Sequence, residues 1–187
     1  MGKIVLASSS PRRAAILKDY TLEIIPSPYI EQHTKTAFSY QYVEDLAYNK
    51  AKAVIPLTKE DTIIIGADTV VVLGEEILEK PKDREDAFLM LKKLSGKTHK
   101  VVTAISMINT TTKQTKTQST TSYVTFNDLT DEVILNYIDK FKPLDKAGSY
   151  GIQELPQGFV KNVEGDFENI MGISSKVVKE MLNLFNW

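Results

Sequence analysis

The sequence predicts an α/β fold, in which a mixed twisted sheet is flanked by helices. Short runs of β-branched apolar residues, such as Ile63–Ile65, alternate with segments that carry apolar residues at helical spacing, such as Tyr40–Ile55. Of the 187 residues, 42% are hydrophobic, which suffices for one substantial core. Because no linker, repeat or low-complexity tract interrupts the chain, residues 1–187 are expected to form a single domain.

The first predicted strand and helix create a candidate anion site. Lys3–Ala7 is expected to be a buried strand, and Pro11 suits the first position of a helix for which Ser10 is a good N-cap. Free backbone N–H groups at a helix N-terminus favour a bound anion, yet Arg12 and Arg13 add positive charge there. A bound phosphate would relieve this conflict, and a capped surface helix with solvated arginines is the alternative.

A central motif runs from the strand Ile63–Ile65 to Pro81. The small residues after this strand are expected to end it and to release Asp68 at its carboxyl end, where α/β proteins commonly place active-site groups. Lys80 stands directly before Pro81, which favours an extended backbone. A carboxylate can bind Mg²⁺ or deprotonate water, and a lysine can bind phosphate. Asp68 and Lys80 are therefore candidate ends of a phosphate-handling site, with a purely structural Asp68 as the alternative.

The other elements follow from periodicity and turn chemistry. By periodicity alone, Lys50 and Lys52 are expected to face solvent from the helix Tyr40–Ile55. Residues 145–153 are small, polar and rich in glycine, and we expect them to form a loop at a cleft. The further predicted strands are Thr21–Ile25, Val70–Leu73, Ile77–Leu78, Val101–Ile108, Gln118–Phe126 and Phe159–Val163, and the further helices are Asp83–Leu94, Thr130–Lys140 and one from Ser174 or Ser175 to Phe185.

Composition excludes several classes of function. A net charge of −1 and a pI of about 6.2 provide no overall basic field for nucleic acid or an anionic membrane. The absence of cysteine excludes disulfides, zinc–thiolate sites and thiol catalysis, and His33 and His99 are too few for a multi-histidine metal site. No stretch is long and apolar enough for a membrane span or a signal peptide, so a cytoplasmic protein is expected. A Walker P-loop and a GxGxxG motif after a strand are also absent.

Five sequence blocks closely resemble motifs of the Maf family and occur in the family's order. Any one block would be weak, but five in register make the resemblance specific. The blocks are Leu6–Arg13 (LASSSPRR), Gly66–Thr69 (GADT), Glu79–Pro81 (EKP), Leu94–Gly96 (LSG) and Asp145–Gln153, which contains DKAG and YGIQ.

This resemblance implies a nucleoside triphosphate pyrophosphatase. Such an enzyme cuts between the α- and β-phosphates and releases a nucleoside monophosphate and pyrophosphate, helped by a divalent cation, Mg²⁺ or Mn²⁺. The implied fold has two lobes around a deep cleft and is similar to that of inosine triphosphate pyrophosphatases. Family members commonly form homodimers and are linked to septum formation and cell-division arrest.

The family motifs also imply roles for individual residues. Asp68 matches the proton acceptor that activates water, and Asp68 with Glu31 would lie near the metal. Glu31 and Lys50 match an acidic and basic pair that lines the cleft. The residues matching groups that hold the triphosphate are Ser8, Arg12, Arg13 and Lys80.

Three positions are associated with substrate choice in the family. Arg12, Thr69 and Gln153 resemble the branch that acts on dTTP and UTP, whereas the 7-methyl-GTP branch tends to carry Trp, Gln and Glu. A glutamine amide both donates and accepts hydrogen bonds, so Gln153 could read a pyrimidine imide edge. After Gln153 this chain has Glu154-Leu155-Pro156-Gln157 where the family usually has glycines. The alternatives are a 7-methyl-GTP-type pyrophosphatase and a non-catalytic nucleotide-binding regulator of cell division.

Overall fold

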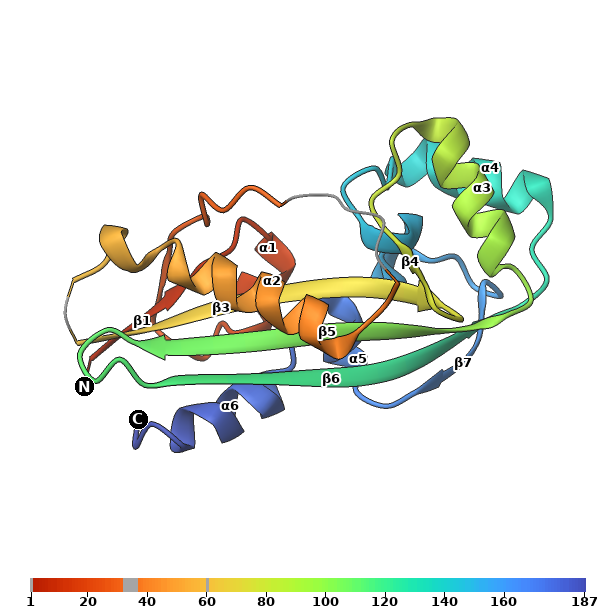
Figure 1. Ribbon diagram of the computed structural model, residues 1–187. Coiled ribbons are helices and arrows are strands. Elements are labelled where there is room, and N and C mark those ends of the chain that lie inside the picture. The colour runs from red at the N-terminus through yellow and green to blue at the C-terminus, as the bar shows by residue number, and fades with distance from the viewer. Residues whose placement is uncertain (1, 32–36, 60) are drawn as a thin grey trace.

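The computed structural model describes residues 2–31, 37–59 and 61–187, and His33 lies outside these ranges. A seven-stranded mixed sheet forms its centre, with the order β2-β1-β3-β5-β6-β7 and with β4 also paired to β3. Helices flank the sheet (Figure 1), which confirms the predicted α/β class. The strands are β1 Lys3–Leu6, β2 Leu22–Ile24, β3 Thr62–Leu73, β4 Glu76–Leu78, β5 Thr98–Asn109, β6 Thr115–Phe126 and β7 Val160–Glu164. The helices are α1 Pro11–Ile16, α2 Tyr40–Lys52, α3 Arg84–Leu94, α4 Asp131–Phe141, α5 Phe167–Met171 and α6 Ser175–Asn183, with 3₁₀ turns at Ile55–Leu57, Ala147–Ser149 and Ile152–Glu154.

Strand β3 is continuous through the small residues that were expected to end it. Its antiparallel ladder with β5 extends without a break from Ile63 opposite Asn109 to Val72 opposite Lys100. The prediction that Asp68 is released at a strand end is therefore wrong, because Asp68 lies inside the strand. The small residues serve close packing instead of a turn.

Alternation along β3 directs its side chains to two differently covered faces. On one face, Val70 and Val72 pack with Val43 and Ala47 of α2. On the other face lie Ile63 and Ile65, together with Val178, Met181 and other apolar residues of α6. Figure 1 shows α2 and α6 on opposite sides of the sheet.

Gly66 allows α2 to approach β3 closely. A Cβ atom built on Gly66 would lie 2.4 Å from the carbonyl oxygen of Ala47 and 2.7 Å from the backbone nitrogen of Ala51. Both atoms belong to the backbone of α2, so they cannot move aside as a flexible side chain would. The helix can occupy its place only because this position carries no side chain.

The edge of β3 that faces β1 and β4 is open over a short stretch. The parallel ladder with β1 ends at the pair Leu6–Ile65, and the antiparallel ladder with β4 begins at Val71 opposite Leu78. Between these pairs, residues 66–70 of β3 have a described strand partner on the β5 side alone. Asp68 lies in the middle of this stretch.

The far end of the sheet lies beside α3 and α4 (Figure 1) and carries a separate aromatic core. Phe126 packs edge-to-face against Tyr150, Phe159 and the ring of His99. His99 is 1% exposed, and its Nε2 lies 2.7 Å from the Tyr150 hydroxyl oxygen, whereas Nδ1 has no partner among the described residues. Desolvation by burial lowers the pKa of His99 to about 4, so the ring is neutral at physiological pH.

Several local predictions differ from the structure. Ser10 precedes α1, but its side chain accepts no capping hydrogen bond, whereas Ser174 caps α6 by accepting from the Val177 N–H. The short helix α5 was missed because its five residues carry too little periodicity. The expected loop at 145–153 contains two 3₁₀ turns.

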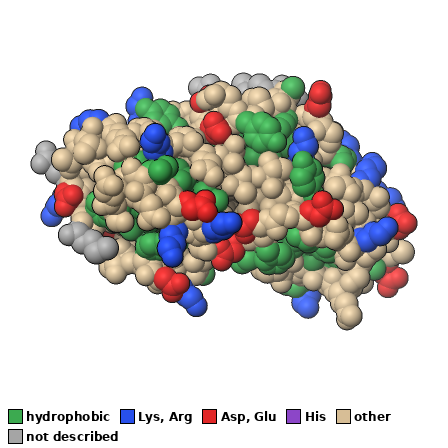
Figure 2. Space-filling view, turned by 90° about the horizontal axis from the view of Figure 1, so that it is seen from below, with side chains coloured by type: hydrophobic (Ala, Val, Ile, Leu, Met, Phe, Trp, Pro, Cys, Tyr) green, Lys and Arg blue, Asp and Glu red, His purple; other side chains and the backbone are tan. Residues whose placement is uncertain are grey.

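The surface mixes charges of both signs. On the face shown in Figure 2, basic and acidic side chains lie close together among apolar ones. Within the described ranges, no helix is both long and apolar enough to span a membrane.

Replacing Gly66 with alanine is expected to lower the free energy of unfolding by about 3 kcal/mol, because the new methyl group meets backbone atoms of α2. Gly74→Ala is the control: Gly74 has φ +64° and open space around it, so alanine costs only about 1 kcal/mol of left-handed strain. Urea unfolding measures both variants. Equal losses would show that α2 does not depend on close packing at Gly66.

Protonation of His99 in the unfolded chain is expected to lower the free energy of unfolding by about 2 kcal/mol between pH 7 and pH 5. The His99 pKa is about 4 in the folded protein against 6.5 for the free side chain. The stabilisation is complete above pH 6.5 and is lost as the pH falls towards 4, since the unfolded chain takes up the proton first. His99→Gln removes the titration, so its unfolding free energy should fall less over this range than that of the wild type. Parallel curves for the two proteins would contradict this assignment.

Candidate active site

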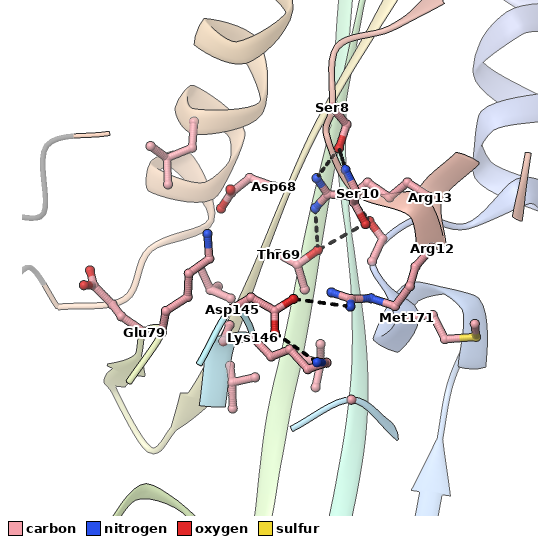
Figure 3. A pocket seen from close by; sticks show the side chains of 18 of the residues that line it. Ser8, Ser10, Arg12, Arg13, Asp68, Thr69, Glu79, Asp145, Lys146 and Met171 are labelled. Atoms are coloured by element: carbon pink, nitrogen blue, oxygen red, sulfur yellow. Dashed lines mark hydrogen bonds and ion pairs between the residues drawn. The ribbon is translucent and has the colours of Figure 1, made fainter. Parts of the chain in front are cut away.

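A cavity of about 410 Å³ lies at the open edge of β3. Its volume is within the range of small-molecule sites. The loop after β1, helix α2, the end of β4, the segment 145–153 and the end of α5 all contribute to its walls. Every predicted site residue lies on this wall, namely Ser8, Arg12, Arg13, Glu31, Lys50, Asp68, Thr69, Lys80 and Gln153. Figure 3 shows several of these side chains turned toward one another.

One side of the cavity holds a compact group of charges. The Lys50 ammonium donates to Asp68 Oδ1 at 2.5 Å and lies 2.6 Å from Glu31 Oε1. The side chains of Asp68 and Lys50 are only 9% and 16% exposed, so this contact is largely shielded from water. Among the described residues, Asp68 Oδ2 has no hydrogen-bond partner and stays available to a ligand or a water molecule.

The structure corrects the periodicity-based prediction for Lys50. Lys52 is exposed, as expected, but Lys50 points to the sheet and meets Asp68. The reason is the close approach of α2 at Gly66, which brings the last turn of the helix over the open edge of β3. Periodicity describes which face of a helix is apolar, and it does not reveal a buried charged partner on another strand.

The opposite face of β3 holds Arg13. Its Nε donates to the carbonyl oxygen of Gly172 at 2.8 Å, Nη1 to Ser8 Oγ at 3.3 Å and Nη2 to Thr69 Oγ1 at 3.1 Å. All three acceptors are neutral. Desolvation by burial lowers the pKa of Arg13 from its ordinary value, an effect that the Asp68 charge opposes, and the guanidinium remains charged. Arg13 is half-buried and has no carboxylate in hydrogen-bond contact among the described residues, so it is favourably placed to receive an anion.

Ser8 is arranged to donate a hydrogen bond into the cavity. Its hydroxyl oxygen accepts from the Ser10 N–H at 3.2 Å and from Arg13 at 3.3 Å. Both acceptor positions are used and the hydroxyl hydrogen has no acceptor in the described part of the chain, so it can be donated to an anionic ligand. The backbone conformation of the loop between β1 and α1 therefore prepares a donor group.

A second charged network lies at the far wall. Arg12 Nη1 lies 3.9 Å from Asp145 Oδ2, and the buried Lys146 ammonium lies 2.9 Å from Asp145 Oδ1 and 3.4 Å from Glu154 Oε2. Partial burial raises the pKa of Asp145, but the hydrogen bond and charge of Lys146 outweigh it, so the pKa lies below its ordinary value. Gln153, next to Glu154, is exposed at the rim.

The remaining predicted residue, Lys80, follows β4 and is exposed at the cavity wall. The sequence reasoning assigned no role to Tyr42, Glu79 or Lys146, which also line the cavity. Burial raises the pKa of the Tyr42 phenol, and the carboxylates around it, first of them Glu79, act in the same direction. Glu79 and Lys146 stand inside the family motifs quoted above, so their motif membership was the available signal. Tyr42 had none.

The carboxylates of Asp68 and Glu31 converge on one cation, the Lys50 ammonium. Across the described ranges, no cluster of three or more His, Cys, Asp or Glu side chains is positioned to hold a metal. Mg²⁺ is commonly bound by one or two carboxylates together with substrate phosphates, so two converging carboxylates fit it. The donor set is oxygen only, which also suits Mn²⁺.

The solved structures that are similar to this chain include two from bacteria. A nucleoside-triphosphatase / dITP/XTP pyrophosphatase from Mycobacterium abscessus is 18% identical, with a TM-score of 0.46 and coverage of 66% of this chain and 72% of that chain. The Staphylococcus aureus Ham1 protein is 21% identical, with a TM-score of 0.47 and coverage of 67% and 72%.

Sequence relatives match over a much larger share of the chain. Proteins named dTTP/UTP pyrophosphatase are similar to it in Clostridium perfringens strain SM101 (43% identical, covering 97% of this chain and 96% of the relative) and in Escherichia coli O157:H7 (41%, 100% and 94%). A third, from Thermoanaerobacter sp. strain X514, is 43% identical and covers 91% of this chain and 90% of the relative. The family model described as Maf-like protein matches residues 3–185. The resemblance seen in the motifs is confirmed, and this chain belongs to the Maf-like protein family.

Proposed function

We propose that this protein is a nucleoside triphosphate pyrophosphatase that hydrolyses dTTP and UTP to the monophosphate and pyrophosphate. One observation carries the proposal: a shielded carboxylate, Asp68, and a half-buried guanidinium, Arg13, lie on one cavity large enough for a nucleotide. The names of the relatives, dTTP/UTP pyrophosphatase, support the same activity and substrate. A homodimer in the cytoplasm remains a prediction.

In the proposed reaction, Asp68 accepts a proton from water while the water oxygen attacks the α-phosphorus. The bond between the α-phosphorus and the bridging oxygen breaks, and pyrophosphate leaves with that oxygen. Lys50 occupies Asp68 Oδ1, so Oδ2 is the oxygen that receives the proton. The 2.5 Å contact also holds the carboxylate in one orientation, which general-base catalysis requires.

The basic side chains that line the cavity are proposed to bind the phosphates. Arg13 has five N–H donors, and three of them are held by Gly172, Ser8 and Thr69, which leaves two for phosphate oxygens. Ser8 adds a hydroxyl donor. The exposed Lys80 and the half-buried Arg12 are proposed to bind the outer phosphates, where negative charge is greatest.

A divalent cation, Mg²⁺ or Mn²⁺, would be held by Asp68 and Glu31 together with the phosphates. When bound, such an ion supplies Lewis-acid stabilisation of charge on the phosphoryl oxygens. Lys50 lies between the two carboxylates, so its ammonium keeps them close together against their mutual repulsion.

Pyrophosphate release from a panel of triphosphates tests the activity. With Mg²⁺ or Mn²⁺ present, release from dTTP and UTP should exceed release from CTP, GTP and 7-methyl-GTP, and added chelator should abolish it. Preference for 7-methyl-GTP would show that the protein belongs to the 7-methyl-GTP branch of the family and not to the dTTP/UTP branch. Nucleotide binding without any release would favour a non-catalytic regulator.

Asp68→Asn is expected to lower turnover by 100-fold or more, the size typical of general-base loss. Asp45→Asn is the matched control, because Asp45 is exposed on α2 and lies outside the cavity. The substrate affinity of Asp68→Asn, measured by calorimetry, should change much less than turnover. Retained turnover would show that Asp68 is structural or a replaceable metal ligand and not the general base.

A further inference from the structure

The Thr69 hydroxyl makes its hydrogen bonds to other residues of the protein. Its hydroxyl oxygen lies 3.1 Å from Arg13 Nη2, 2.9 Å from Thr103 Oγ1 and 3.4 Å from the carbonyl oxygen of Gly172. Figure 3 shows the Thr69 side chain joined to Arg13. Alternation along β3 places it on the face opposite to that of Asp68, so the two neighbours serve different walls of the cavity.

The direction of each hydrogen bond in this group can be assigned. Thr103 Oγ1 lies 2.8 Å from the carbonyl oxygen of Asn169, and a carbonyl only accepts, so the single Thr103 hydrogen is used there. Thr69 then gives its own hydrogen to Thr103 Oγ1 at 2.9 Å in preference to the carbonyl oxygen of Gly172, which lies farther away at 3.4 Å. Because Arg13 can only donate, Thr69 accepts from Nη2. One ordered chain results, from Arg13 through Thr69 and Thr103 to the Asn169 carbonyl.

The end of this hydrogen-bond series at Thr103 and Asn169 is held rigidly. Thr103 is 1% exposed on β5, directly opposite Thr69 in the ladder, and Asn169 is fully buried in the middle of α5. The Asn169 side chain donates to the carbonyl oxygen of Val101 at 3.0 Å. The central sheet and α5 thus anchor the two hydroxyls, and through them they anchor the guanidinium.

We propose that Thr103 is a positioning residue for phosphate binding, and that Thr69 acts through Arg13 and not by contact with the base. The proposal rests on the pyrophosphatase function given above. With its hydrogen donated to Thr103 and a lone pair taken by Arg13, the Thr69 hydroxyl has little capacity left to read a nucleobase. Its effect then falls on the binding of the triphosphate, through the position in which it holds Arg13, and not on the choice of base.

Thr103→Val removes the hydroxyl at nearly constant volume and tests the proposal. We expect the affinity for inorganic pyrophosphate, measured by calorimetry, to fall by up to about tenfold, the upper end of what one hydrogen bond between neutral groups contributes. The kcat/KM for dTTP should fall by a similar factor. Thr103→Ser keeps the hydroxyl and should bind pyrophosphate within about threefold of the wild type.

Thr125→Val is the matched control. Thr125 Oγ1 lies 2.8 Å from Thr98 Oγ1 across the neighbouring pair of strands, β5 and β6, and neither residue lines the cavity. Its pyrophosphate affinity should not change. Melting temperatures of all variants separate loss of folding from loss of binding, and Thr69→Val provides a second, less buried test should Thr103→Val fail to fold.

The ratio of kcat/KM for dTTP to that for CTP distinguishes positioning from base reading. Both Thr103→Val and Thr69→Val should leave this ratio within about twofold of the wild type. A changed ratio with unchanged pyrophosphate affinity would overturn the proposal, as would wild-type pyrophosphate affinity in Thr103→Val. If the wild type binds pyrophosphate but hydrolyses no triphosphate, the proposed function fails, while the calorimetric comparison still tests the positioning of Arg13.

Discussion

The site depends on the interruption of strand pairing along β3. Strand β1 leaves this edge after the pair Leu6–Ile65, and β4 joins it only at Val71. The intervening stretch keeps its ladder with β5, so it remains straight and rigid while its other edge opens to the cavity. A rigid strand with one open edge presents functional side chains with little conformational freedom, which is the preorganisation that catalysis requires.

Successive side chains of β3 point to opposite faces of the sheet, so the carboxylate and the arginine-binding group lie on different sides of the open edge. Asp68 faces α2, where Lys50 holds it at 2.5 Å, and Thr69 faces Arg13 on the other side. The carboxylate is thus balanced by an ammonium, whereas the arginine is held by neutral oxygens. Because Arg13 has no carboxylate in hydrogen-bond contact within the described residues, its charge is available to an anionic substrate.

The sequence predicted the helices that have clear periodicity. It gave wrong predictions at positions whose structure depends on packing between distant segments. The ranges of α2, α3 and α4 were predicted closely, because apolar residues recur along them at helical spacing. The break predicted after Ile65 was wrong, since Gly66 serves the approach of α2 and not a turn. The solvent-facing prediction for Lys50 was wrong for the same reason. Both errors come from one contact between segments that are distant in sequence.

The sequence by itself determined the α/β class, the family and nine of the residues that line the cavity. These follow from local periodicity and from short motifs, which can be read without knowing what lies across the sheet. Only the tertiary structure decided that Asp68 pairs with Lys50, and that Thr69 and Thr103 hold Arg13. Such contacts depend on strand register and on the distance between α2 and β3. A change of one residue in register, or of one methyl group at Gly66, would separate the partners.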